Sequence, residues 1–68
     1  MMKLVISFDE IHEIGNTIKL MPMSKEGYYY LADKIFYNEG WDNMYDLTEH
    51  QIIEIDSVKY VSIDLERK

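Results

Sequence analysis

The 68-residue chain has no cysteine, one proline and three glycines. The lack of cysteine excludes disulfides and thiolate metal sites, and the two histidines, His12 and His50, lie far apart in the sequence. A chain this short buries only about 60% of its unfolded surface, so domains of this size often add a disulfide, a metal or a partner subunit. For this chain, the remaining ways to gain stability are dense packing and self-association.

Lysine and arginine are scarce, with 7 against 13 Asp and Glu, and the net charge is −6. No lysine or arginine occurs between Lys34 and Lys59, although that stretch holds six carboxylates: Glu39, Asp42, Asp46, Glu49, Glu54 and Asp56. A phosphate-binding groove needs clustered Lys or Arg, so we expect no direct nucleic-acid binding. An acidic surface instead favours a basic partner and salt-sensitive association, or it simply keeps a Tyr-rich chain soluble.

Long apolar runs are also missing. No stretch approaches the roughly 18 apolar residues of a membrane span. The opening MMKLVISF has one lysine and an apolar patch shorter than a signal-peptide core, and no small residues of the cleavage type follow it. We therefore expect a cytoplasmic protein that does not bind a membrane.

The first part of the chain predicts two strands. Lys3–Phe8 is rich in strand-forming residues, and Thr17–Met23 alternates apolar and polar residues after the turn pair Gly15-Asn16. Between them, Asp9–Ile14 fits either a bulged extension of the first strand or one helical turn capped by Asp9.

A helix is predicted over Lys25–Asn38. Ser24 is a good N-cap and Gly40 fits the stop position. Apolar residues recur at helical spacing: Tyr28, Leu31, Ala32, Ile35 and Phe36. Gly27 and the run Tyr28–Tyr30 favour the alternative, a hairpin that turns at Ser24–Gly27.

The last part predicts a second hairpin. Trp41–Leu47 is a loop or one to two helical turns, Gln51–Ile55 is a strand, and Asp56-Ser57 is a turn. Lys59–Leu65 alternates cleanly: Val61, Ile63 and Leu65 share one face, and Tyr60, Ser62 and Asp64 the other. The sequence thus predicts a single α+β domain of about four antiparallel strands, ordered ββαββ, with one helix packed on one face. The other face is solvated or used to dimerise.

No catalytic pattern is present. Glu49 and His50 are adjacent, and neighbours on a strand point to opposite faces, so they form a poor acid–base pair. His12 is interpreted as a surface histidine or one with its hydrogen bonds satisfied. We therefore expect a protein that is not an enzyme and needs no cofactor or metal.

Binding is the better interpretation, because Trp and Tyr are enriched at interface hot spots. Trp41 and Tyr45 lie among acids, although Trp41 also fits a role in capping the core. Glu54 and Asp56, two residues apart on a strand, are expected about 6.6 Å apart on one face. The predicted partner-binding residues are Trp41, Asp42, Tyr45, Glu39, Asp46, Glu49, Glu54 and Asp56.

Part of the chain resembles a known family. The residues are Tyr29-Tyr30, Trp41-Asp42, Met44-Tyr45, Thr48 and Ile52-Ile53 with Ile55. Their order and spacing are similar to a Tyr pair, an aromatic–acid pair, Leu-Tyr, Thr and Ile-Ile in the small dimeric uracil-DNA glycosylase inhibitors of Bacillus phages. The identical positions are the Tyr pair, Tyr45, Thr48 and the Ile pair. The match spans less than half of the chain.

The resemblance implies an acidic homodimer that imitates DNA and blocks the DNA-binding face of a host enzyme. It implies that Trp41 lines an apolar enclosure for a side chain of that enzyme, with Asp42 as the adjacent acid and Tyr45 as support. Two features depart from the family: its Tyr pair lies in a strand, and this chain continues into Lys59–Leu65.

We therefore expect a phage-type DNA mimic that inhibits a host DNA-processing enzyme, first of all uracil-DNA glycosylase. Its partner would be a basic DNA-binding protein, and the inhibitor a homodimer. One alternative is a DNA mimic aimed at another enzyme, such as a CRISPR nuclease or a sliding clamp. The other is a non-enzymatic structural or assembly subunit.

Overall fold

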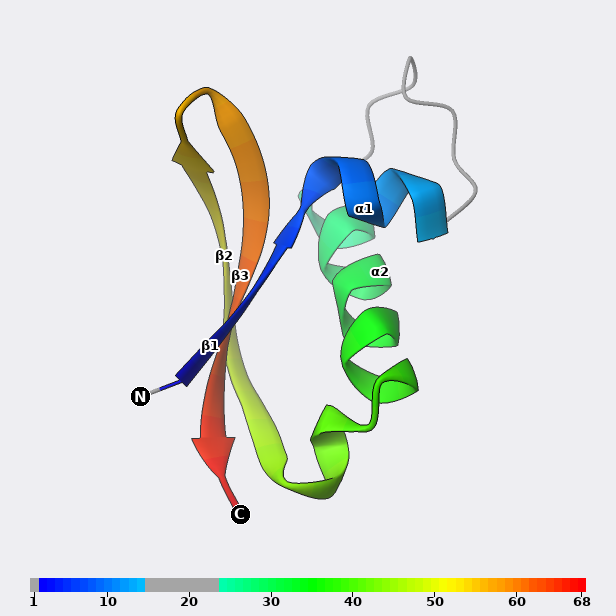
Figure 1. Ribbon diagram of the computed structural model, residues 1–68, viewed down its shortest axis with the longest axis vertical. Coiled ribbons are helices and arrows are strands. Elements are labelled where there is room, and N and C mark those ends of the chain that lie inside the picture. The colour runs from blue at the N-terminus through cyan, green and yellow to red at the C-terminus, as the bar shows by residue number, and fades with distance from the viewer. Residues whose placement is uncertain (1, 15–23) are drawn as a thin grey trace.

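The computed structural model describes residues 2–14 and 24–68. It is an α+β fold in which two helices lie on one side of an antiparallel sheet of three strands (Figure 1). The elements follow in the order β1 (Met2–Ser7), α1 (Phe8–Ile14), α2 (Lys25–Asn38), the 3-10 turn η1 (Trp41–Asn43), β2 (Tyr45–Ile55) and β3 (Val58–Arg67). In the described residues, no helix is long and apolar enough to cross a membrane.

The strands are ordered β1-β3-β2, so β3 is central and antiparallel to both neighbours. The α+β class is therefore as predicted, but the four-stranded ββαββ arrangement is not supported. The described residues hold three strands and two helices. The predicted strand Thr17–Met23 lies outside them.

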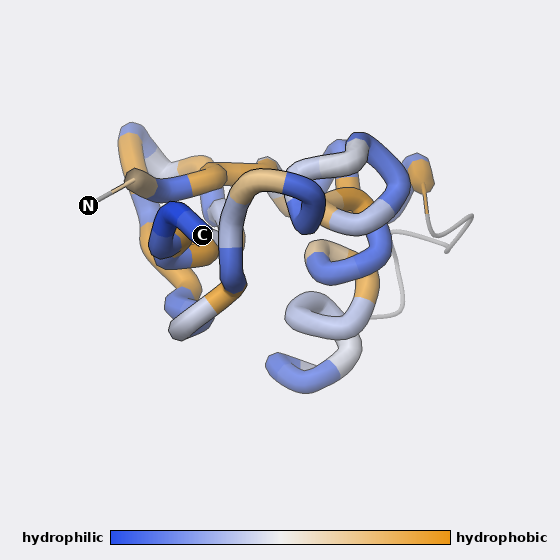
Figure 2. The backbone as a smooth tube through the Cα atoms, turned by 90° about the horizontal axis from the view of Figure 1, so that it is seen from below, coloured by the Kyte–Doolittle hydropathy of each residue, from blue (hydrophilic) through white to orange (hydrophobic). Residues whose placement is uncertain are grey.

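The core lies between the sheet and the helices. Val61 and Ile63 are fully buried on the covered face, and Leu65 nearly so, as the alternation predicted. The helices cover them with buried residues of α1 and α2: Ile11, Tyr28, Ala32, Ile35 and Phe36. Figure 2 shows that hydrophilic and hydrophobic residues are interspersed along the backbone of the sheet and the helices.

The other face of the sheet, here called the open face, carries no helix from residues 2–14 or 24–68. Ser62 and Asp64 on it are nonetheless buried, with 1% and 6% of their surface exposed. The face is therefore not solvated at these two positions, and the alternative that it is used to dimerise stays a prediction. Ser62 is short and lies between its cross-strand partners Val5 and Gln51, whose longer side chains shield it.

Asp9–Ile14 forms a helix and not a strand extension. α1 begins at Phe8, and the Ser7 hydroxyl accepts a hydrogen bond from the Glu10 amide at 3.2 Å, so Ser7 takes the place that we assigned to the Asp9 cap. The buried His12 ring and the Tyr28 hydroxyl lie 2.9 Å apart. This contact joins α1 to α2 and confirms the interpretation of His12 as a satisfied histidine.

The α2 helix has the predicted bounds, and the alternative hairpin is wrong. The Ser24 hydroxyl accepts a hydrogen bond from the Gly27 amide at 3.2 Å, as an N-cap does. Gly40, which follows the C-cap Glu39, adopts φ +81°, a conformation that favours glycine. Local capping thus outweighs the strand preference of the Tyr run.

The β2–β3 hairpin turns at Asp56 and Ser57, with φ of 51° and 67°. Positive φ at both central residues is the conformation that matches strand twist in a two-residue hairpin. β2 begins at Tyr45, well before the predicted Gln51, and its register shifts between Leu47 and Glu49. The pairing with β3 extends the strand beyond what alternation alone indicated.

Candidate protein-binding site

The Trp41 side chain is half-buried at the end of α2. Its indole N–H donates to the Glu39 carboxylate at 2.9 Å, and its ring lies 6.0 Å from that of the buried Tyr45. Trp41 also packs against the core. It is therefore neither sealed inside nor a free surface anchor: one part supports the core, and another part remains accessible beside two acids, Glu39 and Asp42.

The predicted acids do not form one patch. Glu39 and Asp42 lie at the junction of α2 and η1, whereas Asp46 and Glu49 lie on β2. Glu54 lies opposite Lys59, which is on the same face of β3 as the buried Val61. Glu54 is therefore on the covered face and not on the open face. The expectation that Glu54 and Asp56 share a strand face is wrong, because β2 ends at Ile55 and Asp56 is already in the turn.

Instead, the sheet brings together an acidic set that only half coincides with the prediction. Asp46 lies directly opposite Glu66, and Glu49 directly opposite Asp64. We call these four residues the acidic ladder. Sequence reasoning missed Asp64 and Glu66, because their partners are set by the register of β2 against β3. The alternation of Lys59–Leu65 had indicated only the face of Asp64.

Among the described residues, two lysine ammonium groups lie within ion-pair distance of the acidic ladder. The Lys3 ammonium lies 3.1 Å from the buried Asp64 carboxylate, and the Lys68 ammonium lies 4.0 Å from Asp46. Both lysine side chains are about half exposed. Like charges placed directly opposite on neighbouring strands destabilise a sheet. The ladder is thus a concentration of negative charge that the described part of the chain compensates incompletely.

Apolar side chains continue the open face toward the β2–β3 turn. Val5, Ile55 and Val58 are 44%, 51% and 41% exposed, and Ile53 and Tyr60 beside them are half-buried. The open face therefore combines an acidic end with an apolar end. Exposed apolar groups bordered by charge are typical of protein-binding surfaces.

A hollow of about 610 Å³ lies at the acidic end of the sheet. Its lining combines apolar, polar and charged residues: Met2, Tyr45, Thr48, Leu65, Glu66 and Arg67. Of the predicted partner-binding residues, Tyr45 belongs to this lining. Thr48 is fixed at the β2 irregularity, where its hydroxyl donates to the Asp64 carbonyl at 3.1 Å.

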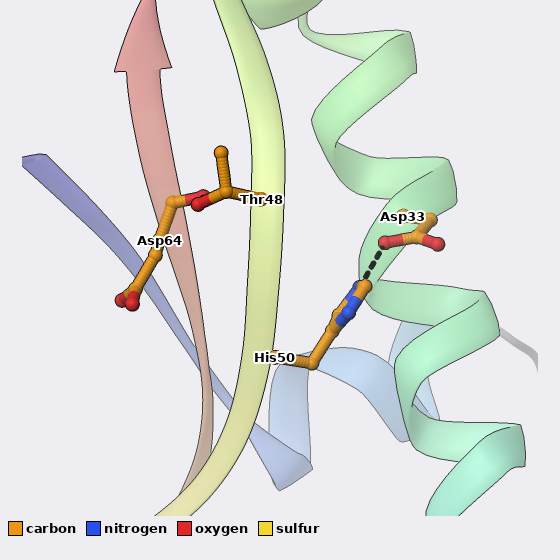
Figure 3. Close-up of polar contacts among 4 residues, drawn as sticks. All are labelled: Asp33, Thr48, His50 and Asp64. Atoms are coloured by element: carbon orange, nitrogen blue, oxygen red, sulfur yellow. Dashed lines mark hydrogen bonds and ion pairs between the residues drawn. The ribbon is translucent and has the colours of Figure 1, made fainter.

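His50 lies on the opposite side of the sheet from Glu49, as their adjacency predicted. Its Nε2 lies 2.6 Å from Asp33 Oδ1 on α2, and its ring stacks on Tyr29 at 4.8 Å. Figure 3 shows His50 directed toward α2 while Asp64 projects from the other side. The pair ties β2 to the helix layer. In the described residues, no group of three or more His, Cys, Asp or Glu side chains is arranged to hold a metal ion.

Comparison of the chain with protein-family models, curated proteins and solved structures finds no match. The resemblance to the phage inhibitors thus rests on the residues named above. Tyr29 and Tyr30 lie in α2, as the helical spacing predicts, and not in the strand that the resemblance implies.

Proposed function

We propose that this protein is an acidic DNA mimic of the phage type, which binds and inhibits a host DNA-processing enzyme in the host cytoplasm. The acidic ladder is the observation that carries the proposal. It places carboxylates on two adjacent strands of the open face, and those of Asp46, Glu49 and Glu66 are exposed, so that a partner's basic groups can reach them. Uracil-DNA glycosylase is the first enzyme to test.

The physical argument starts from the cost of the acidic ladder to the folded chain. Opposed carboxylates repel, and a small domain has little stability to spare. A partner that supplies Lys, Arg or backbone N–H groups relieves this repulsion, because such groups form charge-assisted hydrogen bonds with carboxylates as they do with phosphates. A DNA-binding enzyme presents those groups by necessity.

The second part of the proposed interface is Trp41. Its hydrogen bond to Glu39 and its packing against Tyr45 fix the orientation of the indole before any partner arrives. Pre-organised aromatic side chains bind with a small loss of conformational entropy. Trp41, Asp42 and Glu39 would form an anchoring contact, and Asp46 and Glu49 an electrostatic one.

The direct test is cleavage of uracil-containing DNA by uracil-DNA glycosylase in the presence of this protein. We expect inhibition that weakens steeply as salt rises, because screening acts over about 10 Å at 0.1 M salt. Glu49→Lys should lose most of the inhibition. Glu13→Lys is the matched control, because it makes the same change in net charge at an exposed residue of α1. Equal inhibition by both variants would remove the acidic ladder from the proposed interface.

The closest alternative is a DNA mimic aimed at another target, such as a CRISPR nuclease or a sliding clamp. Inhibition of that target's own activity would be measured with the same two variants. If the wild-type protein leaves the glycosylase fully active, capture from a bacterial lysate at low salt identifies the enzyme that it binds. The Glu49→Lys variant should fail to capture that enzyme, and Glu13→Lys should succeed.

The exposed Val5, Ile55 and Val58 favour one candidate from another class, a structural or assembly subunit that uses the apolar end of the open face. The salt dependence of partner binding distinguishes an assembly subunit from a DNA mimic. Capture of a partner through an apolar surface should hold or strengthen as salt rises, whereas capture by the acidic ladder should fall.

A further inference from the structure

The open face changes in character along its strands. Both described helices lie on the other side of the sheet (Figure 1). Near the β2–β3 turn, Val58 and Ile55 are directly opposite each other and are 41% and 51% exposed. Further along β3, Asp64 lies opposite Glu49 in the acidic ladder. At about 3.3 Å per residue, the distance from Val58 to Asp64 along β3 is about 20 Å.

The middle of the open face has a short side chain on its central strand. Ser62 is 1% exposed and lies between Val5 on β1 and Gln51 on β2. Serine projects less than either neighbour, so an element laid over β3 can approach the sheet closely at this point. Val5 is 44% exposed and continues the apolar surface from the turn end to the middle of the face.

We propose that one α-helix of the partner protein lies along the open face. Its apolar side chains would cover Val5, Ile55 and Val58, and its Lys or Arg side chains would meet the acidic ladder. The inference rests on the proposed function, because it takes the acidic ladder as part of a partner-binding surface and names the chemistry of the partner segment that this surface fits.

The backbone of the occupant favours a helix. The strands of the sheet hydrogen-bond to one another within its plane, so the open face offers side chains to whatever covers it. An extended segment on that face would bury its own N–H and C=O groups without partners, whereas a helix bonds these groups internally. The outer strands of a three-stranded sheet are about 10 Å apart, and a helix with its side chains is about 10–12 Å wide. One helix therefore matches the width of the face.

Charge complementarity sets the composition of the partner helix. The four carboxylates of the acidic ladder have two lysines within ion-pair distance, Lys3 and Lys68, so negative charge remains in excess. The partner meets the exposed members of the ladder, which are Asp46, Glu49 and Glu66. Lys and Arg form charge-assisted hydrogen bonds with such carboxylates. At 1.5 Å per residue, a helix spans the 20 Å between the two ends in about 13 residues, so its apolar and basic groups lie about four turns apart on one side.

NMR titration with a synthetic peptide tests the fit. The probe is a designed helix of about 16 residues, with leucines at one end and lysines at the other end of the same side. The control peptide has the same composition, with its lysines moved to the opposite side. We expect the probe to shift the amide signals of Val5, Val58 and Ser62, and to leave those of Tyr30 and Tyr37 on α2 unchanged. The control peptide should bind at least tenfold more weakly.

Variants at the two ends of the open face should respond differently to salt. Val58→Ser should weaken binding of the probe several-fold at low and high salt alike, because it removes an apolar contact. Glu49→Lys should weaken binding strongly at low salt and less at high salt, because screening reduces the charge contribution. Tyr30→Ser is the control for Val58→Ser, since it removes a 60% exposed side chain from α2. Equal weakening by Tyr30→Ser, or none by Val58→Ser, would overturn the proposal.

The same spectra identify other occupants. Signals of the open face that shift with protein concentration before any peptide is added would show that a second copy covers the face, and would overturn the proposal. Shifts confined to α2, or no binding at millimolar peptide, would overturn it as well. Inhibition of the glycosylase without binding of the probe would remove the helix and keep the proposed function. Binding of the probe by a protein that inhibits no DNA-processing enzyme would do the reverse.

Discussion

His50 on β2 and Asp33 on α2 form a polar contact between the sheet and the helix layer, with Nε2 and Oδ1 2.6 Å apart. Both side chains are partly exposed, at 20% and 34%, so water screens the pair. The ring of Tyr29 stacks on His50 and limits its orientation. This contact fixes how α2 lies against the edge strand.

Breaking that contact should lower stability by a modest amount. We expect Asp33→Ala to reduce the free energy of unfolding by about 1 kcal/mol, the scale of a partly exposed charge-assisted hydrogen bond. Urea unfolding measures it, with Glu13→Ala as a carboxylate control that should change little. A double-mutant cycle with His50→Ala should show coupling of several tenths of a kcal/mol; strictly additive effects would mean that the two side chains do not interact.

Gly40 should be sensitive to any side chain. Its φ of +81° is costly for residues with a Cβ, so Gly40→Ala should reduce the free energy of unfolding by about 1 kcal/mol. Gly27→Ala in the first turn of α2 should have the opposite sign, because alanine is the better helix former. Thermal unfolding of both variants checks this, and a stabilising Gly40→Ala would contradict the left-handed conformation.

Lys3 should stabilise the sheet through Asp64. The Asp64 side chain is only 8% exposed, and the Lys3 ammonium lies 3.1 Å from it. Lys3→Met keeps a long apolar stem but leaves the buried carboxylate uncompensated, at a cost of about 1–2 kcal/mol. Lys3→Arg is the matched control, because it keeps the charge, and urea midpoints should separate the two. Equal midpoints for Met and Arg would show that the cation is unimportant.

The acidic ladder should cost stability in the unbound protein. Glu49→Gln removes one of two opposed carboxylates and should raise the free energy of unfolding by about 0.5 kcal/mol. Added salt should stabilise the wild type more than this variant, because screening weakens a repulsion that only the wild type retains. Unfolding curves at low and high salt measure both effects. Glu13→Gln, a residue outside the acidic ladder, should leave the salt response unchanged.

The last prediction concerns Trp41 and depends on the proposed function. Trp41→Ala combined with Asp42→Ala should abolish inhibition. Because Trp41 packs against the core, the pair should also lower the free energy of unfolding by about 2 kcal/mol. Trp41→Phe with Asp42→Asn preserves most of the packing and separates the two effects. If the Ala pair and this conservative pair both inhibit fully, the interface does not include Trp41 and Asp42.

Several elements were readable from short stretches of sequence. Ser24 and Gly40 bracket α2 because capping depends on a few neighbouring residues, and Asp56-Ser57 turns the hairpin because these types tolerate positive φ. The alternation from Lys59 to Leu65 identified the buried face of β3. The start of β2 was missed, because only its partner strand β3 extends it back to Tyr45.

The sequence by itself determined the α+β class, the bounds of α2, the hairpin turn and the excess of negative charge, since each depends on composition or on residues close together in the chain. Only the tertiary structure decided which acids meet. The irregularity of β2 before Glu49 sets the pairs across to β3, so Asp64 and Glu66 join Glu49 and Asp46, while Glu54 is turned to the other face. Cross-strand register is a property of two segments at once, and no local pattern contains it.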